Sequence, residues 1–111
     1  MGKSIIIGCE TLGRGDKDLG ARLMGSFLRT LAAAVEKPET IIFYNSGVRL
    51  VADDSPVLDA LEALDRDGVD LAACGTCVAH FGLQGRVPVG RESNMQEIVS
   101  ILLGPGDTVT I

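Results

Sequence analysis

The chain has 111 residues, a formal net charge of −5 and three cysteines. This length suffices for one hydrophobic core, so we expect residues 1–111 to form a single domain. The acidic balance and an aromatic content of only 4% argue against nucleic acid as a partner, because nucleic-acid binding requires clustered basic and aromatic side chains.

The sequence also argues against membrane insertion and secretion. The longest apolar runs, such as Ile5-Ile6-Ile7, are too short to cross a bilayer. The first residues lack the apolar region of a secretion signal. An odd number of cysteines is typical of free thiols in a reducing compartment. We therefore expect a cytoplasmic protein that does not bind membranes.

The first half of the chain predicts two buried strands and a helix between them. Residues 3–8 form a β-branched run without polar alternation, as in a strand buried on both faces. After the loop 9–16, Asp16 can cap a helix, which Pro38 ends. The second strand is expected at 40–44. Its apolar continuation, 48–51, has no clear assignment.

The second half repeats the alternation of helix and strand. Ser55-Pro56 predicts a helix start, and Asp67-Gly68 predicts its end. A third strand is expected at 69–73, one or two helical turns at 78–83, and a short extended piece at 87–90. Ser93-Asn94 is expected to cap a last helix, and 108–111 to form the final strand.

Strands that alternate with helices predict an α/β protein with a mainly parallel sheet of about five strands between helices. Right-handed crossovers bring the carboxyl ends of all strands to one edge of such a sheet. The loops at Cys9, Asn45 and Cys74 should therefore meet. Cys9 would lie beside Cys74 if the first and third strands were neighbours.

The strongest functional signal is the tetrad Cys74-Gly75-Thr76-Cys77 at the predicted end of the third strand. A Cys-x-x-Cys pair can exchange electrons, hold half of a zinc site or accept a sulfur atom as a persulfide. A helix that begins here would stabilise a thiolate, and Gly75 would permit a close backbone approach. Both thiols are candidates, with a slight preference for Cys74. The alternative interpretation is two cysteines that pack as small apolar side chains.

Other residues near the strand ends are weaker candidates. Gly13 and Arg14 lie in a glycine-rich loop suited to anions, although the loop also reads as a simple turn capped by Asp16. Asn45 and Ser46 form a turn or line the site. His80 can tune a thiolate or merely pack against apolar neighbours. We expect no metal, because a second pair of zinc ligands is missing, and no cofactor.

Several ordered motifs resemble one known family. They are Gly13-Arg14-Gly15-Asp16, Leu19-Gly20, Phe43-Tyr44-Asn45-Ser46-Gly47-Val48, Ser55-Pro56-Val57-Leu58, the Cys74–Cys77 tetrad, and Gly90 with Ser93-Asn94-Met95. Together they resemble the DsrE-like sulfurtransferase family, most closely the C-terminal domain of YedF-type proteins linked to selenium metabolism. The resemblance spans nearly the whole chain. His80 stands where an aromatic residue is expected.

This resemblance implies a flavodoxin-like three-layer fold and a tendency to form oligomers, and we expect a homo-oligomer. It implies a cysteine near Cys74 that carries sulfur or selenium as a persulfide-type adduct. The partners would be donor and acceptor proteins of that atom, among them a TusA-like carrier. The small TusA-like domain that precedes the YedF-type domain is not found in these 111 residues.

Two other functions stay open at this stage. The Cys74–Cys77 spacing also suits a dithiol-disulfide oxidoreductase, although a thioredoxin-type context is missing. The glycine-rich first loop suits a non-catalytic module that binds a small anion or assembles with partners. Whether the chain is an enzyme is likewise open. If it is one, it is expected to be sulfurtransferase-like.

Overall fold

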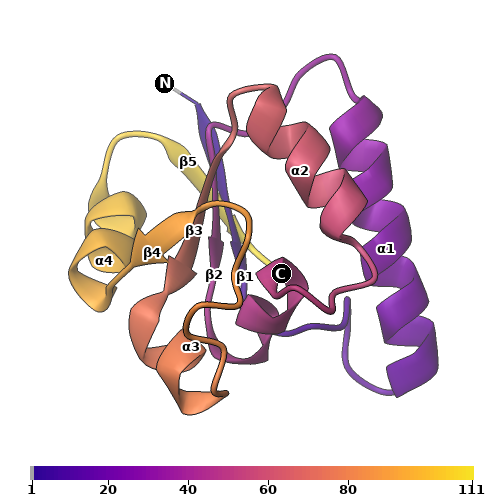
Figure 1. Ribbon diagram of the computed structural model, residues 1–111. Helices are drawn as coiled ribbons and strands as arrows, with labels where there is room; N and C mark the ends of the chain where they lie inside the picture. Colours follow the sequence, from indigo (N-terminus) through magenta and orange to yellow (C-terminus); the bar gives the residue numbers. More distant parts are fainter. Residues whose placement is uncertain (1) are drawn as a thin grey trace.

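The structure is a computed structural model that describes residues 2–111. Five strands and four α-helices follow one another with one 3-10 helix (Figure 1). In chain order the elements are β1 (Lys3–Ile7), α1 (Lys17–Ala33), β2 (Thr40–Phe43), η1 (Asn45–Val51), α2 (Leu58–Arg66), β3 (Asp70–Cys74), α3 (Gly75–His80), β4 (Arg91–Ser93), α4 (Met95–Leu103) and β5 (Asp107–Thr110).

All five strands run parallel in the order β4-β3-β2-β1-β5. Ile5 of β1 is aligned with Ile41 of β2, which is aligned with Leu71 of β3. The three central strands are almost completely buried, which explains why their sequences are continuous apolar runs. Because β2 separates β1 from β3, the condition under which Cys9 would lie beside Cys74 is not met.

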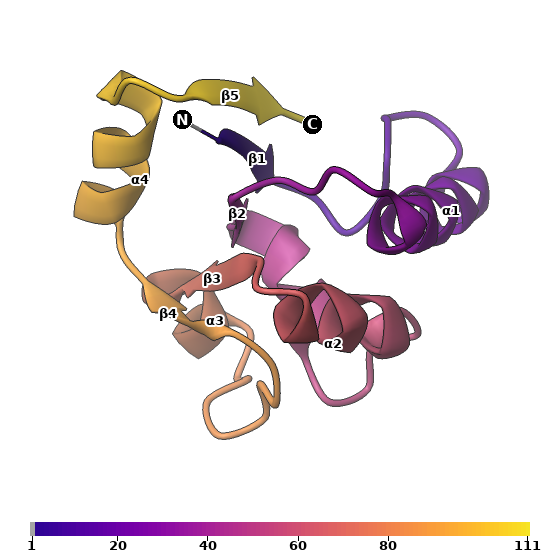
Figure 2. The same cartoon turned by 90° about the horizontal axis from the view of Figure 1, so that it is seen from above.

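Helices cover both faces of the sheet (Figure 2). α1 and α2 pack on one face over a large apolar cluster that includes Ile7, Phe43 and Leu71. α4 packs on the other face, where Ile98 contacts a small cluster around Ile6. The expected three-layer, flavodoxin-like α/β fold is confirmed. Within residues 2–111, no helix combines the length and the apolar character needed to cross a membrane.

The predicted helix starts are partly correct. Asp16 caps α1 as expected, and its carboxylate accepts a hydrogen bond from the amide of Leu19 at 2.8 Å. Asn94 caps α4 in the same way through the amide of Glu97. The prediction for Ser55-Pro56 is wrong, because α2 begins only at Leu58. The Ser55 hydroxyl instead accepts from the Val57 amide at 3.2 Å, which makes a local turn before the helix.

Two further boundaries differ from expectation. α3 begins at Gly75, directly after β3, so Cys77 lies within its first turn rather than before it. Residues 87–90 are not a strand, and β4 begins after them, at Arg91. Gly90 has a φ of +80° and lies against the carbonyl oxygen of Leu71, where a Cβ atom would be 2.6 Å away. This left-handed glycine turns the chain into β4.

The segment without a clear assignment, 48–51, belongs to η1, which follows β2 almost directly. Gly47 explains how η1 fits there. A Cβ atom on Gly47 would lie 2.4 Å from the carbonyl oxygen of Ile7, a main-chain atom that cannot move aside easily. Only glycine therefore lets the start of η1 pack against the end of β1, and this contact places Asn45 and Ser46 at the carboxyl edge of the sheet.

Candidate thiol site at the carboxyl edge of the sheet

The loops that follow β1, β2 and β3 meet at one edge of the sheet, as the strand pattern predicts. The amide of Glu10, after β1, donates to the Ser46 hydroxyl at 3.2 Å. The amide of Asn45, after β2, donates to the Sγ atom of Cys77 at 3.1 Å. The turn Asn45-Ser46 therefore lies between the loop that carries Cys9 and the helix that carries Cys77.

Cys77 is half-buried in the first turn of α3. Its burial raises the pKa of the thiol, and the neighbouring Cys74 raises it further, whereas the hydrogen bond from the Asn45 amide lowers it. The net direction is upward. Asn45 itself has a φ of +50°, an uncommon conformation for a residue other than glycine. A strained residue thus aims its amide at the sulfur atom of Cys77.

Cys74 is the last residue of β3 and is only 5% exposed. Cys77 follows three residues later, in the first turn of α3. All three cysteines are reduced in the structure. Cys74 therefore forms the buried member of the pair, and Cys77 is the member with access to the surface.

Cys9 is a further thiol at the same edge, where the strand pattern places its loop, although the sequence did not identify it as a site residue. Its Sγ atom lies 3.2 Å from the Thr11 hydroxyl. The Thr11 hydroxyl, the Thr11 main chain and the Ser46 hydroxyl lower the pKa of the Cys9 thiol, against smaller opposing effects of burial and of Glu10. A cysteine directly after a buried strand and before a glycine-rich loop was the signal that could have identified it.

A hollow of about 390 Å³ opens beside Cys9. Three residues that the sequence predicted for substrate binding, Gly13, Arg14 and Asn45, line it. The other lining residues are Gly8, Thr11, Tyr44, Thr110 and Ile111. Gly13 adopts a φ of +82°, which the turn requires. Within residues 2–111, Arg14 is exposed and forms no ion pair.

The remaining predicted site residues lie on α3 and do not line this hollow. Thr76 is exposed. His80 is also exposed and packs edge-on against Phe81, with ring centroids 5.1 Å apart. The guanidinium group of Arg49 lies 4.4 Å from the centre of the Phe81 ring. Phe81, and not His80, therefore makes the contact with η1, and a role of His80 in tuning a thiolate stays a prediction.

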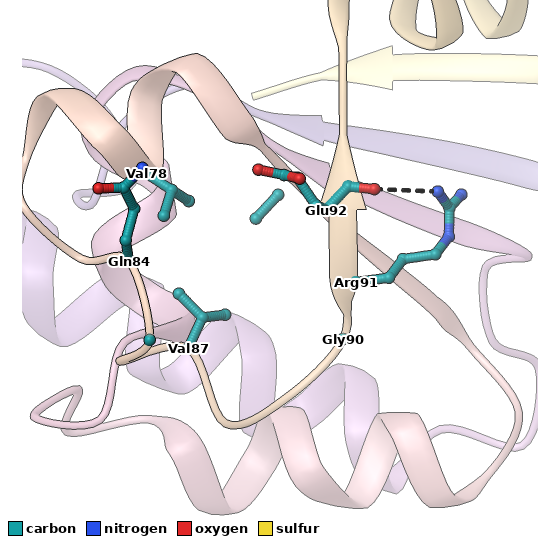
Figure 3. Close-up of a pocket in the computed structure, with 8 residues that line it drawn as sticks. Val78, Gln84, Val87, Gly90, Arg91 and Glu92 are labelled. Atoms are coloured by element: carbon teal, nitrogen blue, oxygen red, sulfur yellow. Dashed lines mark hydrogen bonds between the residues drawn. The ribbon is translucent and has the colours of Figure 1, made fainter.

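A second hollow, of about 350 Å³, lies along α3 and the segment before β4 (Figure 3). Val78, Gln84, Val87 and Glu92 are among its lining residues, and none of them is a cysteine. The Glu92 carboxylate approaches Gly75, where a Cβ atom would lie 2.5 Å from Oε1. The Glu92 side chain therefore occupies the space beside Gly75.

The acid and thiol groups of this edge do not assemble into a metal site. Within residues 2–111, no three His, Cys, Asp or Glu side chains are close enough together to hold a metal ion. The chemistry of the site rests on its thiols, the amide of Asn45 and the charge of Arg14.

Comparison with solved structures shows the same fold in proteins of distant sequence. The ychN protein from E. coli matches with a TM-score of 0.74 over all of both chains, at 14% identity. MTH1491 from Methanobacterium thermoautotrophicum, a protein of unknown function, matches with a TM-score of 0.71 at 18% identity, over 98% of this chain and 97% of its own.

BT1422 from Bacteroides thetaiotaomicron, a conserved protein of unknown function, matches with a TM-score of 0.69 at 18% identity, over 98% of this chain and 94% of its own. No protein-family model and no curated protein matches the sequence. At these identities the likeness concerns the fold alone.

Proposed function

We propose that this protein is a DsrE-like carrier of sulfur or selenium, related to the C-terminal domain of YedF-type proteins. The cargo atom is held as a persulfide-type adduct on Cys77. The observation that carries the proposal is the hydrogen bond of 3.1 Å from the Asn45 amide to the Cys77 sulfur, at the edge where open α/β sheets place their sites. The ordered sequence motifs that resemble this family support it independently.

Burial decides between the two thiols of the tetrad. Cys74 is only 5% exposed and cannot meet a donor without local opening, whereas Cys77 keeps part of its surface accessible. We therefore assign the carrier role to Cys77, although the sequence slightly favours Cys74. Cys74 remains a thiol beside the adduct while Cys77 holds the cargo atom for an acceptor.

Loading and unloading are two thiol exchange steps. The Cys77 thiolate attacks the outer sulfur of a donor persulfide, the donor S–S bond breaks, and the donor leaves as a thiolate. An acceptor thiolate later attacks the same outer sulfur, and Cys77 leaves as a thiolate whose charge the Asn45 amide stabilises. No oxidant is consumed in either step, because the sulfur atom keeps its oxidation state.

The raised pKa of Cys77 suits a carrier better than a rapid enzyme. A thiol of higher pKa is a poorer leaving group, so an adduct on Cys77 is retained until an acceptor approaches closely. The same property slows loading at neutral pH, because less thiolate is present. We infer that the donor and the acceptor are proteins, and that a TusA-like carrier is one of them. We also propose that the chain acts in the cytoplasm as a homo-oligomer.

A dithiol-disulfide oxidoreductase is the second candidate, and the Cys-x-x-Cys spacing favours it, with Cys74 at the end of β3 and Cys77 in the first turn of α3. In that function the pair would cycle between dithiol and disulfide without any bound cargo. A carrier differs from it in the product: a single extra chalcogen atom on one cysteine, with the other thiol free.

Peptide mapping by mass spectrometry tests the proposal. The reduced protein is incubated with a persulfide donor and each cysteine is read separately. We expect one added sulfur atom on Cys77, retained in Cys74→Ser and absent in Cys77→Ser. Circular dichroism shows whether each variant is folded. An unchanged mass at Cys77, under conditions in which a known acceptor protein loads, refutes the carrier function.

A further inference from the structure

The hollow beside Cys9 contains a thiol, a cation and main-chain turns in one place, yet the carrier cycle of Cys77 does not use it. Cys9, Arg14 and Asn45 line it together. Its thiol is half-buried, so it is held in a defined position and can still be reached. Cys77 is not among the residues that line the hollow, although Asn45 both lines it and donates its amide to Cys77.

We propose that this hollow is a second loading site, in which Cys9 accepts a sulfane sulfur atom from small anionic persulfides and Arg14 attracts their negative charge. The inference rests on the proposed function of the protein as a sulfur carrier. It adds a second thiol and a second class of donor, because Cys77 is fed by proteins and Cys9 by low-molecular-weight compounds.

Charge selects the ligand. The protein as a whole carries −5, so an anionic donor is repelled by most of the surface. Arg14 is a free cation at the hollow in the described part of the chain, and no acidic side chain is among the residues that line it. Glu10 is the nearest acidic neighbour in sequence. Glu10 lines a different hollow, and its charge raises the pKa of the Cys9 thiol less than the hydrogen bonds of Thr11 lower it.

The volume also selects the ligand. A hollow of about 390 Å³ has the dimensions of a small-molecule site and not those of a protein interface. A persulfide of an amino acid or of a short peptide fits this size. Its carboxylate would approach Arg14 while its outer sulfur atom meets Cys9.

The transfer of sulfur from the donor to Cys9 is a thiol exchange and needs no oxidant. The Cys9 thiolate attacks the outer sulfur of the donor, R–S–SH, and a new S–S bond forms between Cys9 and that atom. The donor S–S bond breaks, and R–S⁻ leaves with the electron pair. The proton on the transferred sulfur stays with it, so Cys9 ends as a persulfide and the donor as a thiolate.

The environment of Cys9 favours rapid exchange, in contrast to Cys77. The Thr11 hydroxyl at 3.2 Å and the Ser46 hydroxyl stabilise its thiolate, so more of the nucleophile is present at neutral pH. The same stabilisation makes Cys9 a better leaving group. We therefore expect both loading and unloading of sulfur to be faster at Cys9 than at Cys77.

Two donors of equal size but different charge test the proposal: the persulfide of N-acetylcysteine, which is anionic, and that of its uncharged amide. Loading of each cysteine is followed over time by peptide mapping at neutral pH, in the wild-type chain, Arg14→Gln and Arg22→Gln. Arg22 is an exposed arginine of α1 that does not line the hollow, so it is the matched control.

We expect Cys9 to load before Cys77, and Arg14→Gln to slow the loading of Cys9 by the anionic donor about two- to fivefold, the effect of one exposed charge. Arg22→Gln and the uncharged donor should show no such loss. An unloaded Cys9 beside a loaded Cys77 overturns this inference and leaves the proposed function intact. Equal rates for both arginine variants overturn the role of Arg14 and with it the anionic donor site. A loaded Cys9 beside an unloaded Cys77 agrees with this inference, because small donors are assigned to Cys9. Cys77 is then offered a protein that carries a persulfide, and failure to load from that donor counts against the proposed function alone.

Discussion

The main-chain amide of Asn45 donates a hydrogen bond to the sulfur of Cys77, which joins the end of β2 to the first turn of α3. Asn45 reaches this position only because Gly47 lets η1 pack on the end of β1. The surroundings of the Cys77 thiol on α3 thus depend on Gly47, a residue of η1. Substitutions at this turn should therefore change the reactivity of Cys77 without touching a cysteine.

Gly47→Ala tests that dependence. The added methyl group would lie 2.4 Å from the carbonyl oxygen of Ile7, so η1 must move and the Asn45 amide must leave Cys77. We expect a loss of about 1–3 kcal/mol in the free energy of unfolding, as for other overpacked sites, and slower loading of Cys77. Chemical denaturation and peptide-resolved loading measure the two effects.

Gly68→Ala is the matched control for Gly47→Ala. Gly68 has a φ of +91° and open space around its Cα atom, so the substitution strains the backbone far from the thiols. The variant should lose a comparable share of stability yet load Cys77 at the wild-type rate. If both variants load equally slowly, general destabilisation and not the Asn45 amide explains the effect.

Cys9 and Cys77 should differ in their response to pH. The pKa of Cys9 is lowered, chiefly by the Thr11 hydroxyl, and that of Cys77 is raised, chiefly by burial. Alkylation by iodoacetamide requires the thiolate, so its rate at Cys9 should reach half of its maximum below pH 9.0, the ordinary value, and at Cys77 above it. The reverse order of the two midpoints would show that the hydrogen bonds of Thr11 do not hold in solution.

The pKa of Glu97 is lowered, first by Arg91 and then by Ser93. A carboxylate with a lowered pKa stabilises the fold above its unfolded pKa, and this contribution is lost as the pH falls through the folded value. The wild-type free energy of unfolding should therefore decline as the pH is lowered from about 4.5. In Arg91→Gln this part of the decline should be smaller.

Arg91→Gln should also lower the free energy of unfolding at neutral pH. Arg91 bonds to Asp70 at 2.8 Å and to Glu97 at 2.6 Å, and so ties β4 to β3 and α4. Because these side chains are partly exposed, we expect a loss of only about 1 kcal/mol in urea denaturation. Arg66→Gln removes the same charge from the end of α2, where no ion pair forms within residues 2–111, and should have little effect. Equal losses in both variants would contradict the network.

The fold follows from local sequence to a large degree. The buried strands β1, β2 and β3 are recognisable as β-branched and apolar runs, and the Asp16 cap is recognisable from residue type. The error at 87–90 arose because two valines around a proline look extended, whereas the left-handed Gly90 turns the chain before β4 starts. Short edge strands are fixed by such long-range contacts rather than by their own residues.

The site is less readable from sequence than the fold. The tetrad and the Asn45-Ser46 turn are visible as motifs, but which loops touch depends on the strand order, which local patterns do not determine. Cys9 illustrates this limit. Its contact with Thr11 is local, but the Ser46 hydroxyl reaches this loop only because η1 packs on the end of β1, a relationship between residues 36 positions apart.

The most direct test of the carrier function follows one labelled atom. The protein is loaded with a persulfide donor whose outer sulfur is a heavy isotope, freed of the donor, and then mixed with an acceptor thiol. We expect the label on Cys77 to persist until the acceptor is added and then to appear on the acceptor, with all three cysteines left as thiols. Release of labelled sulfide without an acceptor, together with a Cys74–Cys77 disulfide, would contradict the account and identify the protein as a dithiol-disulfide oxidoreductase.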